Sequence, residues 1–164
     1  MFHRRNWIAV IVVILGFVMF IPVAQAQRQD FEYILCTAQT GNIAHASPEV
    51  GFWTYDAKGI IQSTHENKLF DNWTSHAVGV TKMVSGKWSW NGLAKRMAPD
   101  GEFIIWENYG DSESGSTWKA VYGTGKWKGI KAESKGKAIT RGKPIVQGTL
   151  QVCEKVVGWI ELPK

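Results

Sequence analysis

Cysteine is scarce in this chain, and helical periodicity is almost absent from it. The two cysteines, Cys36 and Cys153, form no CxxC pair and have no histidine close by in sequence, so the usual setting of a redox or nucleophilic thiol is missing. No HxH or HxxxH spacing suggests a metal site. The glycine-rich segment around Gly125 lacks the GxGxxG spacing of a dinucleotide site. We therefore expect no metal and no cofactor.

Tryptophan and glycine, in contrast, are abundant after residue 26. Eight of the nine tryptophans and sixteen of the seventeen glycines lie there. Flat apolar rings combined with evenly scattered turn residues are typical of a small all-β protein with an aromatic interior. The roughly 138 residues after this point are enough for one domain with its own core and too few for two.

The first 26 residues have the three parts of an export signal. A positive start, His3 to Arg5, precedes an apolar run from Trp7 to Ile21, and Ala24 and Ala26 flank a cleavage position. A membrane anchor is the alternative, because the run is only slightly shorter than the roughly 17–25 residues that span a bilayer. The Ala-x-Ala ending and the lack of a basic stop-transfer flank favour cleavage. We predict a signal peptide over 1–26, a domain over 27–164, a periplasmic or secreted protein and no permanent membrane anchor.

The chain after residue 26 is mildly basic, with 17 Lys and Arg against 14 Asp and Glu and a formal charge of +3. The basic residues between Lys126 and Lys143 alternate with Gly, Ser and Thr, which is typical of the solvated face of strands and turns. Export and the small net charge argue against a nucleic-acid partner. An anionic ligand or a membrane headgroup fits these basic residues better than a nucleic acid does.

The two cysteines of an exported chain allow one intramolecular pairing, so we predict a Cys36–Cys153 disulfide. It would close a loop of more than a hundred residues. For such a loop, chain entropy gives a stabilisation of roughly 4–5 kcal/mol as an upper figure. The bond would tie the first strand to the last apart from a short tail, as a closed or nearly closed barrel allows.

Alternating segments and turn signals predict about eight to ten short strands at hairpin spacing, as in an antiparallel barrel or sandwich. Pro99-Asp100-Gly101 is the strongest turn signal, and Ala57-Lys58-Gly59 is expected to separate two strands. The segment Gly41 to Glu49 is expected to form a loop over one mouth, and Trp127 to plug one end at a glycine corner. Strands are expected at 31–38, 50–56, from 60, and at 73–84, 88–90, 103–109, 117–122, 137–140, 145–153 and 158–162.

Residues Trp118 to Gly129, with the strands after them, resemble the closing half of the allene oxide cyclase-like barrel, a relative in shape of lipocalins and dirigent proteins. This resemblance covers about a third of the chain and implies a single eight-stranded antiparallel barrel with an apolar lumen. It also implies a superfamily in which some members are cyclases or isomerases and others bind or steer ligands. The cyclase's catalytic carboxylate aligns with no position of this chain.

The whole chain after residue 26 also resembles small secreted bacterial proteins of uncharacterised function. The runs that carry this resemblance are Thr74-Ser75-His76 with Val78-Gly79-Val80, Asp100-Gly101-Glu102-Phe103, and Arg141-Gly142-Lys143-Pro144-Ile145.

Candidate acid and base groups follow from alternation on two strands. If the face of Phe103 and Ile105 points inward, Glu107 and Tyr109 project into an apolar lumen, where burial raises the pKa of a carboxyl group. The alternative places both at the rim, paired with a lysine or with the backbone. His76 and Glu107 form an acid/base pair only if their strands are neighbours. Whether the protein is an enzyme stays open.

Tryptophan supplies the candidate ligand contacts. An eight-stranded interior holds only side chains or one small ligand, so eight tryptophans cannot all fill it. Such rings at a mouth or lumen suit apolar and aromatic molecules; the alternative is that they plug both ends. The predicted lining is Trp53, Trp88, Trp90, Trp106 and Trp118.

The sequence therefore favours an exported barrel that binds a small apolar or aromatic molecule. A cyclase or isomerase using general acid/base residues is one alternative, and an envelope structural or interaction protein with a plugged barrel is another. The oligomeric state is open.

Overall fold

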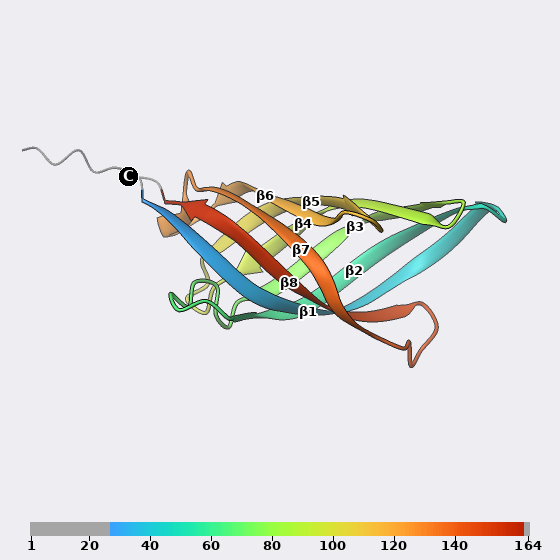
Figure 1. Cartoon of the computed structure of the whole chain (residues 1–164), viewed down its shortest axis with the longest axis horizontal. Helices are drawn as coiled ribbons and strands as arrows, with labels where there is room; N and C mark the ends of the chain where they lie inside the picture. Colours follow the sequence, from blue (N-terminus) through green and yellow to red (C-terminus); the bar gives the residue numbers. More distant parts are fainter. Residues whose placement is uncertain (1–26, 163–164) are drawn as a thin grey trace, which may run out of the picture.

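A computed structural model describes residues 27–162. Eight antiparallel strands close into one barrel in chain order, with β8 pairing back to β1 (Figure 1). This confirms the predicted fold class, whereas the predicted signal peptide lies outside the described residues. No helix within residues 27–162 has the length and hydropathy that crossing a bilayer requires. The strands are β1 (Arg28–Ser47), β2 (Val50–Ser63), β3 (Thr74–Val84), β4 (Lys87–Met97), β5 (Phe103–Asp111), β6 (Gly115–Gly123), β7 (Lys131–Gly142) and β8 (Thr149–Glu161), and a 3-10 turn, η1 (Gly125–Trp127), follows β6.

The two ends of the barrel differ (Figure 1). The β1–β2, β3–β4, β5–β6 and β7–β8 connections lie at one end, called here the open end. The opposite, closed end carries segments 64–73, 98–102 and 124–130, together with the start of β1 and the end of β8. Side chains alternate between the two faces of each strand. The inward side chains Tyr33, Ile61, Trp106 and Val156 are fully buried and help to fill the closed half.

Aromatic rings pack the closed half around Phe70. The Phe70 ring centroid lies 4.8 Å from that of Phe31, 4.9 Å from that of Trp73 and 6.3 Å from that of Trp127. The first two pairs are edge-to-face and the third is stacked, and aromatic pairs of these kinds contribute about 0.5–1.5 kcal/mol each beyond burial of their area. Trp127 is buried directly after the glycine corner, which confirms that it plugs one end.

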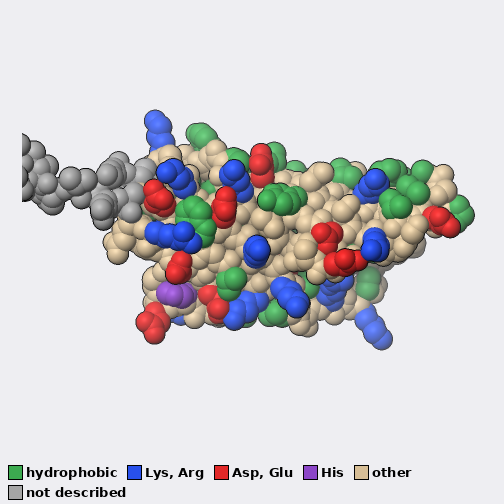
Figure 2. All heavy atoms as spheres, turned by 45° about the horizontal axis from the view of Figure 1, so that its top comes forward, with side chains coloured by type: hydrophobic (Ala, Val, Ile, Leu, Met, Phe, Trp, Pro, Cys, Tyr) green, Lys and Arg blue, Asp and Glu red, His purple; other side chains and the backbone are tan. Residues whose placement is uncertain are grey.

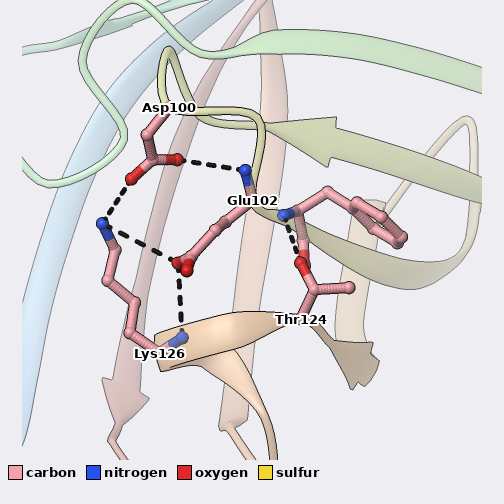
Figure 3. Close-up of polar contacts among 5 residues, drawn as sticks. Asp100, Glu102, Thr124 and Lys126 are labelled. Carbon is pink, nitrogen blue, oxygen red and sulfur yellow. Dashed lines mark hydrogen bonds and ion pairs between the residues drawn. The ribbon is translucent and has the colours of Figure 1, made fainter.

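Polar contacts fasten η1 to the β4–β5 turn across the closed end (Figure 3). The Lys126 ammonium lies 2.7 Å from Asp100 Oδ2 and 3.9 Å from Glu102 Oε2. The Lys126 backbone N–H donates to Glu102 Oε2 at 3.3 Å, and the Phe103 N–H donates to Thr124 Oγ1 at 2.9 Å. Exposed ion pairs are individually weak. The backbone hydrogen bonds therefore fix the position of this corner more than the charges do.

The predicted disulfide is confirmed between Cys36 of β1 and Cys153 of β8. The two residues are direct cross-strand partners, with Cα atoms 4.0 Å apart and a sequence separation of 117. The bond therefore links the first and last strands of the barrel at the seam where the chain closes on itself.

Two predicted breaks in the first hairpin are wrong. Ala57-Lys58-Gly59 is not a turn, because these residues lie inside the continuous strand β2. A side chain at Gly59 would place its Cβ 2.1 Å from the Cys36 carbonyl oxygen, so this glycine marks a close backbone approach and not a turn. The expected loop Gly41 to Glu49 is mostly strand, because β1 runs to Ser47 and pairs with β2. The result is a long hairpin that extends beyond the barrel (Figure 1).

The prediction of two strands at the end of the chain is also wrong. The two strands expected at 145–153 and 158–162 are one strand, β8, and residues 143–148 are the connection before it. Gly158 lies within β8, where an added Cβ would meet the Glu133 carbonyl oxygen at 2.4 Å. This glycine too permits close packing and does not interrupt the strand.

Candidate functional site

A cavity of about 510 Å³ occupies the open half of the barrel. Residues from all eight strands and from the β7–β8 connection line it, and the residues nearest the hairpins, such as His45, Met83 and Pro144, surround its mouth. Its size falls in the range of roughly 300–1,000 Å³ that is usual for small-molecule pockets. The filled closed half forms its floor.

Four of the five tryptophans predicted to contact a ligand line this cavity: Trp53, Trp88, Trp90 and Trp118. Trp88 is partly exposed near the β3–β4 hairpin, whereas Trp118 is buried. Trp106 does not line the cavity. It lies in the closed half with no exposed surface, 6.1 Å from Phe70 between ring centroids. Its role in the structure is to support the floor.

One carboxyl group points into this mostly apolar space. Glu154 lies on β8 and lines the cavity between the inward residues Val152 and Val156. One of its oxygens accepts a hydrogen bond from Ser116 Oγ at 3.1 Å. Burial raises the pKa of Glu154, and the Ser116 hydrogen bond and the Arg96 charge oppose this shift. The cavity thus holds a carboxyl group that keeps its proton to a higher pH than an exposed glutamate does.

A second polar pair, Tyr55 of β2 and Asn108 of β5, also lines the cavity. The Tyr55 hydroxyl donates to Asn108 Oδ1 at 3.3 Å, and burial raises the pKa of Tyr55. Two glycines make room for the ring, because a Cβ at Gly79 or Gly92 would lie 2.4 or 2.5 Å from the Tyr55 hydroxyl oxygen. Glycine at these two positions of β3 and β4 therefore forms the recess in which Tyr55 sits.

An arginine lies beneath the cavity floor. Arg96 of β4 has no exposed surface, and its guanidinium carbon is 4.2 Å from the ring centroid of Trp118, 4.8 Å from that of Trp106 and 5.4 Å from that of Tyr33. Its Nη1 donates to the Tyr33 hydroxyl, whereas Nε and Nη2 have no hydrogen-bond partner. Burial lowers the pKa of Arg96 and raises the pKa of Tyr33 to about 12. Three aromatic faces stabilise this buried cation.

The three predicted acid/base residues lie on the outer face of the barrel. Glu107 and Tyr109 are exposed, because the Phe103 face of β5 points outward and the face of Trp106 and Asn108 points inward. His76 is also exposed, with Nε2 3.1 Å from Asp56 Oδ2. Its strand, β3, is separated from β5 by β4. The structure therefore does not bring His76 and Glu107 together, and it gives neither of them access to the lumen.

The inward-facing charged residues Glu154 and Arg96 are not among the residues predicted from the sequence. For Glu154, alternation between Val152 and Val156 was a usable signal, because two apolar inward residues on either side place the glutamate on the same face. Arg96 lies in the same way between the buried residues Ala94 and Ala98, but the signal is weaker, because alanine is common on both faces of a strand and charged Lys95 stands beside Arg96. Within the described residues, no three His, Cys, Asp or Glu side chains are grouped as a metal ion would need.

The shape of the barrel matches known structures, although its sequence does not. No protein-family model matches the chain, and no curated protein matches it in sequence. The pterocarpan synthase dirigent protein GePTS1 superposes with a TM-score of 0.55 and 9% identity, covering 85% of this chain and 94% of that one. The chain shares the fold of a dirigent protein.

A second dirigent structure, the pterocarpan synthase PsPTS1, is similar at a TM-score of 0.46 and 11% identity, covering 84% of this chain and 97% of that chain. The closed eight-stranded barrel itself agrees in broad form with the predicted lipocalin-like architecture. The resemblance to allene oxide cyclase in particular stays a prediction, as does the relation to small secreted bacterial proteins.

Proposed function

We propose that this barrel binds one small, mostly apolar molecule with an aromatic or otherwise flat portion in the cavity of its open half. The observation that carries the proposal is a cavity of about 510 Å³ lined by four tryptophans. Tryptophan rings give a large apolar contact area at little cost in conformational entropy. A barrel plugged at both ends fits less well, because side chains fill only the closed half.

The placement of polar groups suggests how such a molecule would be oriented. Glu154 and Ser116 lie on one wall, and Tyr55 and Asn108 on another, while the surrounding surface is largely apolar. A few fixed polar groups in an apolar pocket usually set the orientation of a ligand. A ligand with one polar end, able to hydrogen-bond with the Glu154 carboxyl, and an apolar body toward the tryptophans suits this arrangement.

Titration with a neutral fluorescent probe such as N-phenylnaphthylamine tests the proposal. Residues 27–164 contain every strand of the closed barrel and both cysteines, and are the form to use. We expect saturable binding, with energy transfer from tryptophan to the probe. Trp90→Leu and Trp118→Leu should each weaken binding by about tenfold, since a buried aromatic contact contributes on the order of 1–2 kcal/mol.

Trp159→Leu is the matched control. Trp159 lies on β8 but faces outward, and its ring centroid is 4.4 Å from the guanidinium carbon of Arg28. Replacing it should therefore leave the affinity for the probe unchanged. Equal weakening by all three leucine variants would argue for a general loss of structure. Absence of saturable binding by a varied set of apolar and aromatic compounds would contradict the proposal itself.

A second candidate function is acid/base chemistry on the bound molecule, and the buried carboxyl of Glu154 favours it. A carboxyl group whose pKa is raised in a cleft is a typical proton donor or acceptor. The dirigent neighbour GePTS1 is named as a synthase, but at 9% identity no residue role transfers from it. Compounds that bind should be incubated in deuterium oxide and examined by mass spectrometry. Deuterium uptake that Glu154→Gln abolishes and Trp159→Leu preserves supports catalysis; no uptake by any bound compound contradicts it.

A further inference from the structure

The connection between β7 and β8 has an unusual composition for an exposed loop. Its two central aliphatic residues, Ile145 and Val146, are 87% and 64% exposed, and Ile145 is the most exposed of the large hydrophobic residues in the described part of the chain. Aliphatic side chains that stay exposed at a loop tip contribute no burial of apolar surface to the stability of the fold. Their presence indicates a surface that is covered by something else.

The stem that carries this tip is basic. From residue 134 to residue 153 the chain contains four basic residues and no acidic one. All four are exposed, and the formal charge of this stretch exceeds that of the entire chain after residue 26. The four are Lys135, Lys137, Arg141 and Lys143. A basic stem below an aliphatic tip is complementary to one kind of surface, an anionic bilayer with an apolar interior.

The tip is held in place by the backbone. The Thr149 N–H and hydroxyl both donate to the Val146 carbonyl, at 3.2 and 2.6 Å. The Gly41 N–H donates to the Gly148 carbonyl at 3.2 Å, which ties the loop to β1. In Figure 1 the orange-red connection reaches out from the barrel wall on the open side. Insertion into a bilayer therefore requires little additional ordering of this loop.

The loop also borders the cavity mouth. Arg141, Pro144 and Gly148 line the cavity, so a surface in contact with Ile145 and Val146 lies next to the entrance. Figure 2 shows further hydrophobic side chains, together with basic and acidic ones, toward the end of the molecule away from the grey segment. An apolar molecule dissolved in the bilayer would have a short path into the barrel.

We propose that the β7–β8 connection docks the open end of the barrel on an anionic lipid bilayer. Ile145 and Val146 insert at the boundary between headgroups and acyl chains, and Lys137, Arg141 and Lys143 contact anionic headgroups. This goes beyond ligand binding and does not depend on which molecule the cavity takes.

Co-sedimentation with vesicles tests the docking, using residues 27–164 so that the apolar run from Trp7 to Ile21 is absent. We expect binding to vesicles of phosphatidylcholine mixed with phosphatidylglycerol. Binding to phosphatidylcholine alone should be at least about tenfold weaker, and added salt should weaken the binding to mixed vesicles. Lack of binding to the mixed vesicles, or equal binding to both kinds, overturns the proposal.

Two pairs of matched variants locate the contact. Ile145→Ser with Val146→Ser removes the apolar tip without changing charge and should lower the partition coefficient by about tenfold or more. Val121→Ser with Val157→Ser makes the same change at two exposed valines on the barrel wall and should have no effect. Lys137→Gln with Lys143→Gln should weaken binding by about fivefold per residue, whereas Lys119→Gln with Lys128→Gln should weaken it much less.

Two results would contradict docking of this loop on a bilayer. Equal loss in the tip and wall variants would show that no particular surface binds the membrane. A wild-type dimer in sedimentation velocity that the tip variants dissociate would mean that the tip packs against a second copy of the chain. Because these measurements contain no probe, their outcome is separate from the ligand titration: a barrel that binds the probe but not vesicles would refute docking alone.

Discussion

The guanidinium of Arg96 lies 4.2 Å from the centre of the Trp118 ring, so a buried cation supports the same tryptophan that forms part of the cavity wall. No carboxylate lies within ion-pairing distance of Arg96 in the described residues; its one hydrogen bond goes to Tyr33. The aromatic faces and this hydroxyl therefore carry most of the stabilisation of a charge that burial disfavours.

Replacing Arg96 with methionine tests this arrangement. Arg96→Met removes a buried charge, which alone is often neutral or stabilising, but it leaves the Tyr33 hydroxyl without its donor. We expect a loss of about 1–3 kcal/mol in the free energy of unfolding. Arg96→Met with Tyr33→Phe should recover most of that loss, as measured by urea denaturation. Additive effects of the two substitutions would show that the residues are not coupled.

Reduction of the Cys36–Cys153 disulfide should lower stability. The bond spans 117 residues, so the chain-entropy model gives up to about 4–5 kcal/mol. Urea denaturation with and without a thiol reductant measures this difference. Cys36→Ser with Cys153→Ser is the control and should not respond to reductant. An unchanged midpoint in the reduced wild type would mean that cross-strand pairing of β1 with β8 alone sets the stability of the seam.

Glu154 should make stability decrease as the pH rises from its ordinary pKa of 4.5. Burial raises the pKa of the folded state, so the unfolded chain releases this proton first and is favoured until the folded group also ionises. The Glu154→Gln variant has no carboxyl group at this position, so it lacks this pH-dependent contribution to the free energy of unfolding. The difference in the free energy of unfolding between Glu154→Gln and wild type should therefore grow with pH across this window. Because the lowered carboxyl pKa values of Asp100 and Asp111 affect both proteins equally, the difference isolates Glu154; a constant difference would contradict the expectation.

The recess for Tyr55 predicts a linked loss of stability and binding. A Cβ at Gly92 would lie 2.4 Å from the Val78 carbonyl oxygen and 2.5 Å from the Tyr55 hydroxyl. Gly92→Ala should cost about 1–3 kcal/mol in unfolding free energy and move Tyr55 toward the cavity, weakening probe binding. Gly142→Ala is the control, because the nearest atoms to its Cβ all belong to the flexible Gln151 side chain and its backbone. Probe affinity equal in both variants would show that Tyr55 does not shape the cavity.

The sequence predicts the architecture better than the site. Hairpin spacing and alternation are local signals and indicate an antiparallel barrel or sandwich. The two cysteines favour a closed barrel, and the resemblance to the cyclase-like barrel implies eight strands. The face of a strand is harder to assign when both faces carry apolar residues: on β5, Phe103 and Ile105 lie outside while Ile104 and Trp106 lie inside. That ambiguity placed Glu107 and Tyr109 in the lumen. The predicted turn at Gly59 is wrong for a related reason, since a close backbone approach depends on a neighbouring strand that the local sequence does not reveal.

The packing of Phe70, Trp73 and Trp127 at one end leaves the barrel with a single entrance. Aromatic rings fill that half, whereas the cavity occupies the other. Substitutions around the mouth can therefore alter what the barrel accepts without threatening the fold. Under the proposed function, a chain built this way could change its ligand while keeping its shape, and the same shape is found in a structure of only 9% sequence identity.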